Sequence, residues 1–150
     1  MSRAAFYAHF QDKLALLDYA MLCKQHELLD LSGEARPRDL MRHMLERIRD
    51  DRVFYRELVL NELDWRFLEV LSGSLSQFIE RVRRECPTEA DVEPSLSSLY
   101  CAGGMANLVF WWVRNDFPLS VDELAEAQNA LIEGSLGVCL PTDARTCRHG

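Results

Sequence analysis

The stretch from Ser2 to Leu17 carries the most specific arrangement of polar side chains in the chain. Phe6 and Phe10 are four residues apart, so they share one face of a helix and can anchor it. Three polar side chains fall on the other faces and remain available to contact a partner: Arg3, Tyr7 and His9.

Asp12 and Lys13 mark the predicted start of a second, longer helix, which Asp12 can cap. A lysine in the first turn opposes the helix dipole by a few tenths of a kcal/mol. A phosphate bound at that helix N-terminus would explain its presence. The pattern therefore predicts a short helix, a tight turn and the opening of a long helix.

The string Ser-Arg-Ala-Ala-Phe-Tyr-Ala-His-Phe-Gln-Asp-Lys closely resembles the recognition helix and following turn of TetR-type bacterial transcriptional regulators. The resemblance implies a helix-turn-helix whose second helix lies in the major groove of operator DNA. It also implies DNA contacts from five residues, the last of them to a backbone phosphate: Ser2, Arg3, Tyr7, His9 and Lys13.

In that family two further helices precede this stretch, whereas this sequence begins at Met1. A recognition helix of about two turns is not stable alone in water. We therefore expect the chain as written not to bind DNA specifically. We hypothesise that its start lies inside the true gene, at a GTG codon translated as Met; an in-frame stop codon immediately upstream would contradict this.

Composition is that of a soluble globular protein, with 48% hydrophobic and 27% charged residues in 150. No signal peptide or membrane span is expected, so the sequence predicts a cytoplasmic protein. Residues 1–84 hold 14 Lys and Arg against 14 Asp and Glu, whereas residues 85–150 hold 3 against 10. The acidic second half should therefore point away from DNA.

Apolar residues recur at helical spacing along the whole chain, which predicts an all-α fold of about six to seven helices. The expected helices are 12–31, one from about 38, a short one at 53–60, 65–85, 95–114 and a last helix that Ser120 begins with a capping box. A kink or close helix crossing is expected at 72–74. Residues 1–11 are read as a helix-turn-helix remnant, 12–136 as a regulatory domain and 137–150 as a flexible tail.

The segment 95–114 is apolar on nearly every side, which in a small protein indicates burial against a second subunit. Residues 110–125 also resemble the junction of the last two helices in TetR-type regulators of dihydroxyacetone kinase operons. That resemblance implies a homodimer built from those two helices. The expected interface residues are Trp112, Leu124, Gln128 and Leu131.

The resemblance further implies an unknown small-molecule effector in a pocket among the central helices. An apolar or aromatic ligand is favoured, because no cationic cluster is apparent. The candidate lining residues are Phe54, Leu58, Phe67, Tyr100 and Trp111.

No enzyme motif, cofactor motif or metal-ligand spacing is present, so neither catalysis nor a cofactor nor a metal site is expected. Two hypotheses remain. The chain is a ligand-responsive regulator in N-terminally truncated form, or it is a dimerisation or ligand-binding module that pairs with a full-length relative without binding DNA.

Overall fold

The computed structural model describes residues 2–29, 33–61, 63–88 and 92–141, apart from the side chain of Phe6. Within these residues it contains six α-helices and no strand, which confirms the predicted all-α fold. The helices are α1 (Arg3–Leu28), α2 (Pro37–Asp50), α3 (Arg52–Leu60), α4 (Asp64–Glu85), α5 (Pro94–Arg114) and α6 (Val121–Leu136).

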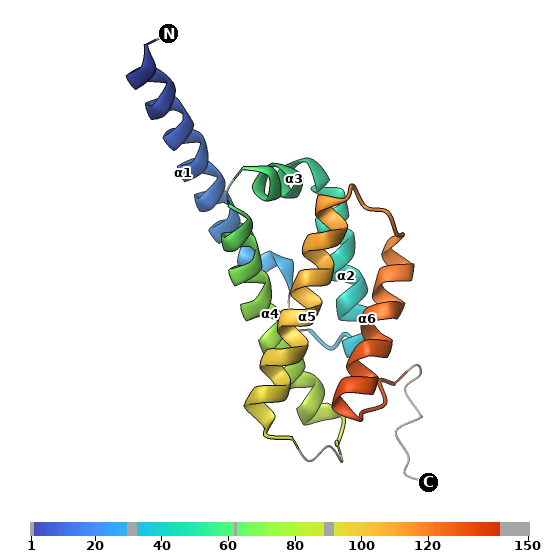
Figure 1. Cartoon of the computed structure of the whole chain (residues 1–150). Coiled ribbons are helices and arrows are strands. Elements are labelled where there is room, and N and C mark those ends of the chain that lie inside the picture. The colour runs from blue at the N-terminus through green and yellow to red at the C-terminus, as the bar shows by residue number, and fades with distance from the viewer. Residues whose placement is uncertain (1, 30–32, 62, 89–91, 142–150) are drawn as a thin grey trace.

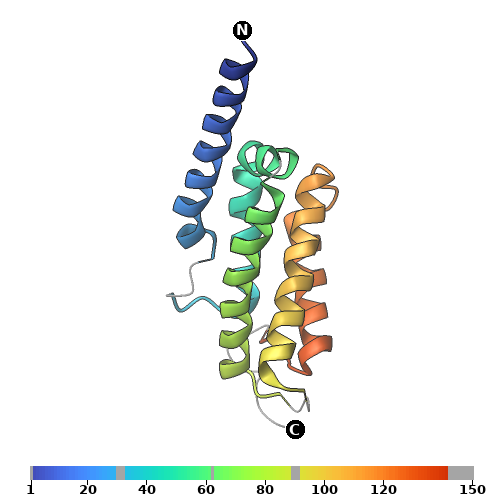
Figure 2. The ribbon, with the colours of Figure 1, turned by 60° about the vertical axis from the view of Figure 1, so that its left-hand side comes forward.

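Four helices, α2, α4, α5 and α6, form the body, and the short α3 lies across one end of it (Figure 1). The C-terminal half of α1 packs beside α4, whereas its N-terminal half extends past α3 away from the body (Figure 2). α4 pairs most extensively with α5, and α6 packs mainly on α2. The molecule is thus a helical bundle from which one long helix projects.

The predicted apolar stripes form the core. On α2 every apolar residue of the stripe is buried, from Leu40 to Ile48. On α4 the stripe from Leu71 to Val82 is buried in the same way. Burial of such side chains contributes about 1.5–3 kcal/mol each, so the body of the protein is held by these facing stripes.

The expected turn at Asp12 is wrong, because α1 continues without a break from Arg3 to Leu28. Ser2 caps it, its Oγ accepting a hydrogen bond from the backbone N–H of Ala5 at 3.2 Å. The physical reason is that the segment contains neither glycine nor proline, and alanine and leucine favour helix throughout. The expected short helix and long helix are therefore one element.

α5 has a buried face and an exposed face. Its buried face includes Trp112, whose indole N–H donates to the carbonyl of Leu119 at 2.8 Å. Its exposed face carries Leu96, Leu99 and Tyr100, each more than 60% exposed. By length and composition α5 could cross a membrane, a test that the core helix of a soluble bundle also passes.

The capping box at the start of α6 is confirmed, with Ser120 Oγ accepting from the N–H of Glu123 and the Glu123 carboxylate accepting from the N–H of Ser120. At the other end Gly137 has φ +62°, which turns the chain back on itself. Val138 and Leu140 are consequently buried, so the first part of the expected tail packs on the body. Residues 142–150 of that tail lie outside the described residues.

Candidate functional site

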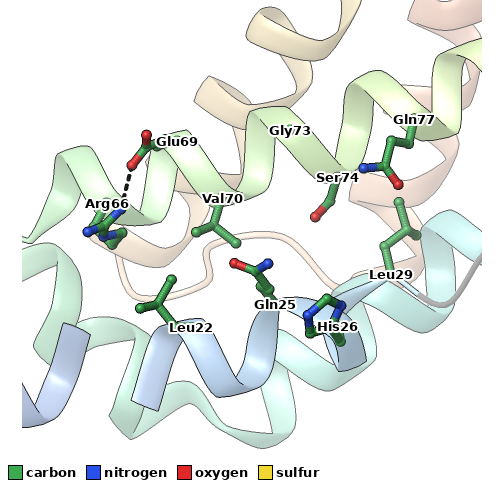
Figure 3. A pocket seen from close by; sticks show the side chains of 10 residues that line it. All are labelled: Leu22, Gln25, His26, Leu29, Arg66, Glu69, Val70, Gly73, Ser74 and Gln77. Carbon is green, nitrogen blue, oxygen red and sulfur yellow. Dashed lines mark hydrogen bonds and ion pairs between the residues drawn. The ribbon is translucent and has the colours of Figure 1, made fainter. Parts of the chain in front are cut away.

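A groove of about 560 Å³ separates the C-terminal half of α1 from the middle of α4. Figure 3 shows side chains from the two helices facing each other across it. α1 contributes Leu22, Gln25, His26 and Leu29. α4 contributes Arg66, Glu69, Val70, Gly73, Ser74 and Gln77.

Gly73 lies in the α4 wall of the groove, where the sequence predicts a kink or a close helix crossing. No close crossing occurs at Gly73, because a Cβ added there would meet no atom within 4 Å, and α4 is helical on both sides of it. A glycine inside a helix costs about 1 kcal/mol relative to alanine. Nothing packed against Gly73 in this chain compensates for that cost, and its effect on the structure is to leave space in the groove.

Four uncharged polar side chains face the middle of the groove: Gln25, His26, Ser74 and Gln77. Among the described residues none of the four forms a side-chain hydrogen bond or an ion pair. Two amides, a hydroxyl and an imidazole together offer both donors and acceptors. The groove therefore presents a mixed set of hydrogen-bonding groups that is available to a ligand, between the apolar side chains of Leu22, Leu29 and Val70.

One end of the groove is closed by an arginine with two carboxylate partners. Arg66 donates from Nε to Asp18 on α1, and from Nη1 to Glu69 on its own helix at 2.8 Å. Its guanidinium also lies over the ring of Trp65, 4.7 Å from the centroid. The hydrogen bond to Asp18 raises the pKa of Arg66. The charge of Arg66 is therefore balanced by two carboxylates, and its pair with Asp18 links α1 to α4.

Further polar contacts tie α1 to α2 and α3. Lys13 Nζ lies 3.0 Å from the Glu57 carboxylate on α3. Lys24 pairs with Asp51, and Arg47 on α2 donates to the carbonyl of Glu27. The hydrogen bond from Lys13 lowers the pKa of Glu57. These polar contacts add to the apolar packing of Met21 and Leu28 in attaching α1 to the body.

The five residues expected to contact DNA all lie on the projecting half of α1. Ser2 caps the helix, and Arg3, Tyr7 and His9 are exposed along it. Lys13, expected on a phosphate, pairs with Glu57 instead. The structure therefore brings these residues together on one projecting helix.

The five residues expected to line an effector pocket do not come together. Leu58 and Phe67 are fully buried in the core, where the Phe67 ring packs 5.4 Å from that of Tyr55. Phe54 is half-buried against Tyr55. The remaining two, Tyr100 and Trp111, lie on the outer face of α5, away from Phe54, Leu58 and Phe67.

The residues expected at a dimer interface separate into two kinds. Trp112, Leu124 and Gln128 are at most 2% exposed and pack inside this chain. Leu131 is 54% exposed, and with Tyr100 it borders a small apolar hollow of about 230 Å³ between α5 and α6.

Sequence reasoning missed the groove because its lining residues follow no motif. Gln25, His26 and Gln77 occupy polar positions of amphipathic helices, where surface residues are expected. Gly73 is the one available signal, since a mid-helix glycine needs a reason. Among the described residues no cluster of His, Cys, Asp or Glu is arranged to hold a metal ion.

Comparisons with known proteins agree with the architecture. The sequence model of a family described as transcriptional regulator C-terminal region (TetR_C_8) matches residues 36–134, about two thirds of the chain. Among solved structures, the dihydroxyacetone kinase operon activator DhaS has the same fold, with a TM-score of 0.68 at 17% identity. That similarity covers 91% of this chain and 78% of DhaS. No curated protein matches the sequence.

Proposed function

Because the chain belongs to the TetR family of transcriptional regulators, through the C-terminal region matched over residues 36–134, we propose that it is a ligand-responsive regulator of operator DNA. It acts as a homodimer in the bacterial cytoplasm and catalyses no reaction. Residues 1–11 serve as the DNA-facing segment of a helix-turn-helix domain, which preceding helices complete in a longer form. Residues 12–136 form the ligand-binding and dimerisation domain.

The continuity of α1 supports this proposal more than any other observation. One end of the helix carries Arg3, Tyr7 and His9, and the other end forms a wall of the groove. A rise of 1.5 Å per residue puts about 33 Å between Arg3 and Gln25, so a tilt of about 5° would move the far end by about 3 Å. A ligand that favours one tilt therefore changes the position of the DNA-facing residues.

The attachment of α1 suits such a movement. Its last turns bury Met21 and Leu28 in the core, whereas Leu14 and Leu17 nearer its middle are only partly buried against it. The contacts of Lys13 and Lys24 are ion pairs near the surface, which typically contribute about 0–1 kcal/mol each, and the partly buried pair of Arg66 with Asp18 adds to them. A ligand with a few kcal/mol of preference for one arrangement is enough to shift the equilibrium.

The exposed face of α5 is the proposed dimer contact. Its apolar side chains continue across the hollow beside Leu131, and exposed apolar patches of this kind commonly mark interfaces. Leu131→Arg should therefore shift the chain toward monomer in sedimentation velocity. The matched control is Leu60→Arg, at a similarly exposed leucine on α3; an equal shift with both variants would refute the assignment.

DNA binding is tested on two forms, the 150-residue chain and a chain extended by the in-frame codons upstream. Each is used to select sequences from random duplex DNA, and affinity is then measured by fluorescence anisotropy over a range of salt concentrations. In the form that binds, Arg3→Ala should weaken binding by about tenfold or more if it contacts a base edge. The control is Arg84→Ala, which removes the same charge from the far end of α4.

Equal losses for the two variants would refute a recognition role for Arg3. Selection of no sequence by either form, with the dimer intact, would refute the regulator proposal. That outcome would support the alternative of a module that pairs with a full-length relative. Selection by the 150-residue chain alone would show that preceding helices are not required.

A further inference from the structure

We propose that the groove between α1 and α4 is the effector site, and that its ligand is a small, uncharged molecule with several hydroxyl groups. The inference rests on the proposed ligand-responsive function, and it names the site and the chemical class of the effector. Size is consistent with it: about 560 Å³ lies within the usual range of about 300–1,000 Å³ for small-molecule sites.

Charge balance disfavours the ionic classes of ligand. With histidine counted as neutral, the lining holds one cation, Arg66, and one anion, Glu69, and these two are paired with each other. An anionic ligand would have to displace Asp18 and Glu69 from the guanidinium. A cationic ligand would have to share Glu69 with Arg66, whose own charge would repel it. Neither kind of ion finds an unpaired charge in the lining, so an uncharged ligand fits the groove better.

Hydrogen bonding selects hydroxyl groups. Gln25 and His26 on α1 face Ser74 and Gln77 on α4, so donors and acceptors are available from both sides of the groove (Figure 3). An amide supplies two donors and an acceptor, and a hydroxyl group of the ligand can satisfy either kind. A ligand with hydroxyls on successive carbons can bridge the two helices.

The apolar lining suits the carbon skeleton of such a ligand. Leu22, Leu29 and Val70 offer aliphatic surface against which C–H groups can pack. None of the ten lining residues is Phe, Tyr or Trp, so the groove lacks the large aromatic side chains that typically line sites for aromatic ligands. This lining differs from the apolar or aromatic ligand that the sequence favours.

Gly73 supplies the test, because it is the position where a side chain would occupy the ligand's space. A leucine there meets no existing atom at its Cβ and removes the glycine cost to helix stability. Gly73→Leu should therefore fold at least as well as the parent chain while filling the groove. The matched control is Gly134→Leu on α6, another helical glycine with no atom within 4 Å of its added Cβ.

Binding is measured on the full chain by thermal shift and by changes in amide NMR spectra. The probes are glycerol, erythritol, ribose and glucose at millimolar concentration, each compared with a charged analogue such as glycerate, gluconate or glucosamine. At least one neutral probe should raise the melting temperature and shift the amide signals of Gln25 and Gln77, as a ligand of the native state does. Gly73→Leu should abolish that response, and Gly134→Leu should leave it unchanged.

Three results would overturn the inference: no response to any probe, a stronger response to the charged analogues, or a response that survives Gly73→Leu. Its failure is separable from failure of the proposed function. DNA binding without any polyol response would refute the ligand assignment alone. A polyol response blocked by Gly73→Leu, in a chain that selects no DNA in either form, would refute the regulator proposal and leave the ligand site standing.

Discussion

Gln128 on α6 is fully buried, and among the residues that the structure describes neither its amide nitrogen nor its amide oxygen has a hydrogen-bond partner. A buried amide left without a partner costs about 1–3 kcal/mol in protein mutational data. Methionine is unbranched, close in size and apolar, so Gln128→Met removes this cost at the same position. The new side-chain shape typically costs less than about 1.5 kcal/mol, which is subtracted from that gain.

We therefore expect Gln128→Met to stabilise the chain by about 1–2 kcal/mol, which for a domain of this size raises the melting temperature by about 2–8 °C. The free energy of unfolding is measured by urea denaturation followed by circular dichroism, at several protein concentrations. Gln11→Met is the control, since Gln11 is exposed on α1 and its replacement should change stability by less than about 0.5 kcal/mol.

A loss of more than about 1 kcal/mol at every protein concentration would refute the reasoning, because it would mean that the amide has a partner inside the monomer, such as a buried water. A loss that appears only at concentrations where the parent chain is dimeric would refute it in another way. The amide would then reach the second subunit, as the sequence predicts for Gln128. Sedimentation velocity on the same samples separates the two cases.

Three smaller effects are also expected. Ser120→Ala removes half of the α6 capping box and should cost about 1 kcal/mol in urea denaturation; no loss would mean that the cap is not formed in solution. Lys13 lowers the pKa of Glu57, so their pairing should stabilise the chain above the ordinary pKa of glutamate and be lost as pH falls through the lowered value. Lys13→Ala should return the NMR-measured pKa of Glu57 toward that ordinary value, and an unchanged pKa would contradict the ion pair. Cys23 is exposed, whereas burial raises the pKa of the Cys101 thiol, so peptide mapping should find Cys23 alkylated far faster.

Most of the body was predictable from the sequence because its helices are amphipathic and short links separate them. The stripe from Leu40 to Ile48 repeats at helical spacing, and each position in it is buried. The start of α6 was equally clear, since Ser120 and Glu123 specify a capping box by local chemistry alone. These features depend on neighbours in the sequence, which sequence reasoning can see.

The candidate site was not predictable, because it depends on which helix faces lie opposite each other. Aromatic residues such as Phe67 suggested a ligand pocket, yet aromatic side chains fill cores as readily as they line pockets. Gln25 and Gln77 are 52 positions apart in the sequence and share a groove only because α1 packs on α4. Patterns of type and spacing within one helix contain no information about such pairs.

Lys13 connects the opening stretch of the sequence with the body of the fold. In the structure Glu57 holds it, and the Glu57 carboxylate also accepts a hydrogen bond from Asn61 at 3.1 Å. Both partners of the ion pair are nearly half exposed, so the contact is worth about 1 kcal/mol or less. Because the contact with Glu57 is weak, we propose that operator DNA can draw Lys13 onto a backbone phosphate, a contact that also gains from the release of counterions. A small tilt of α1 that moves Lys13 away from Glu57 would favour that exchange.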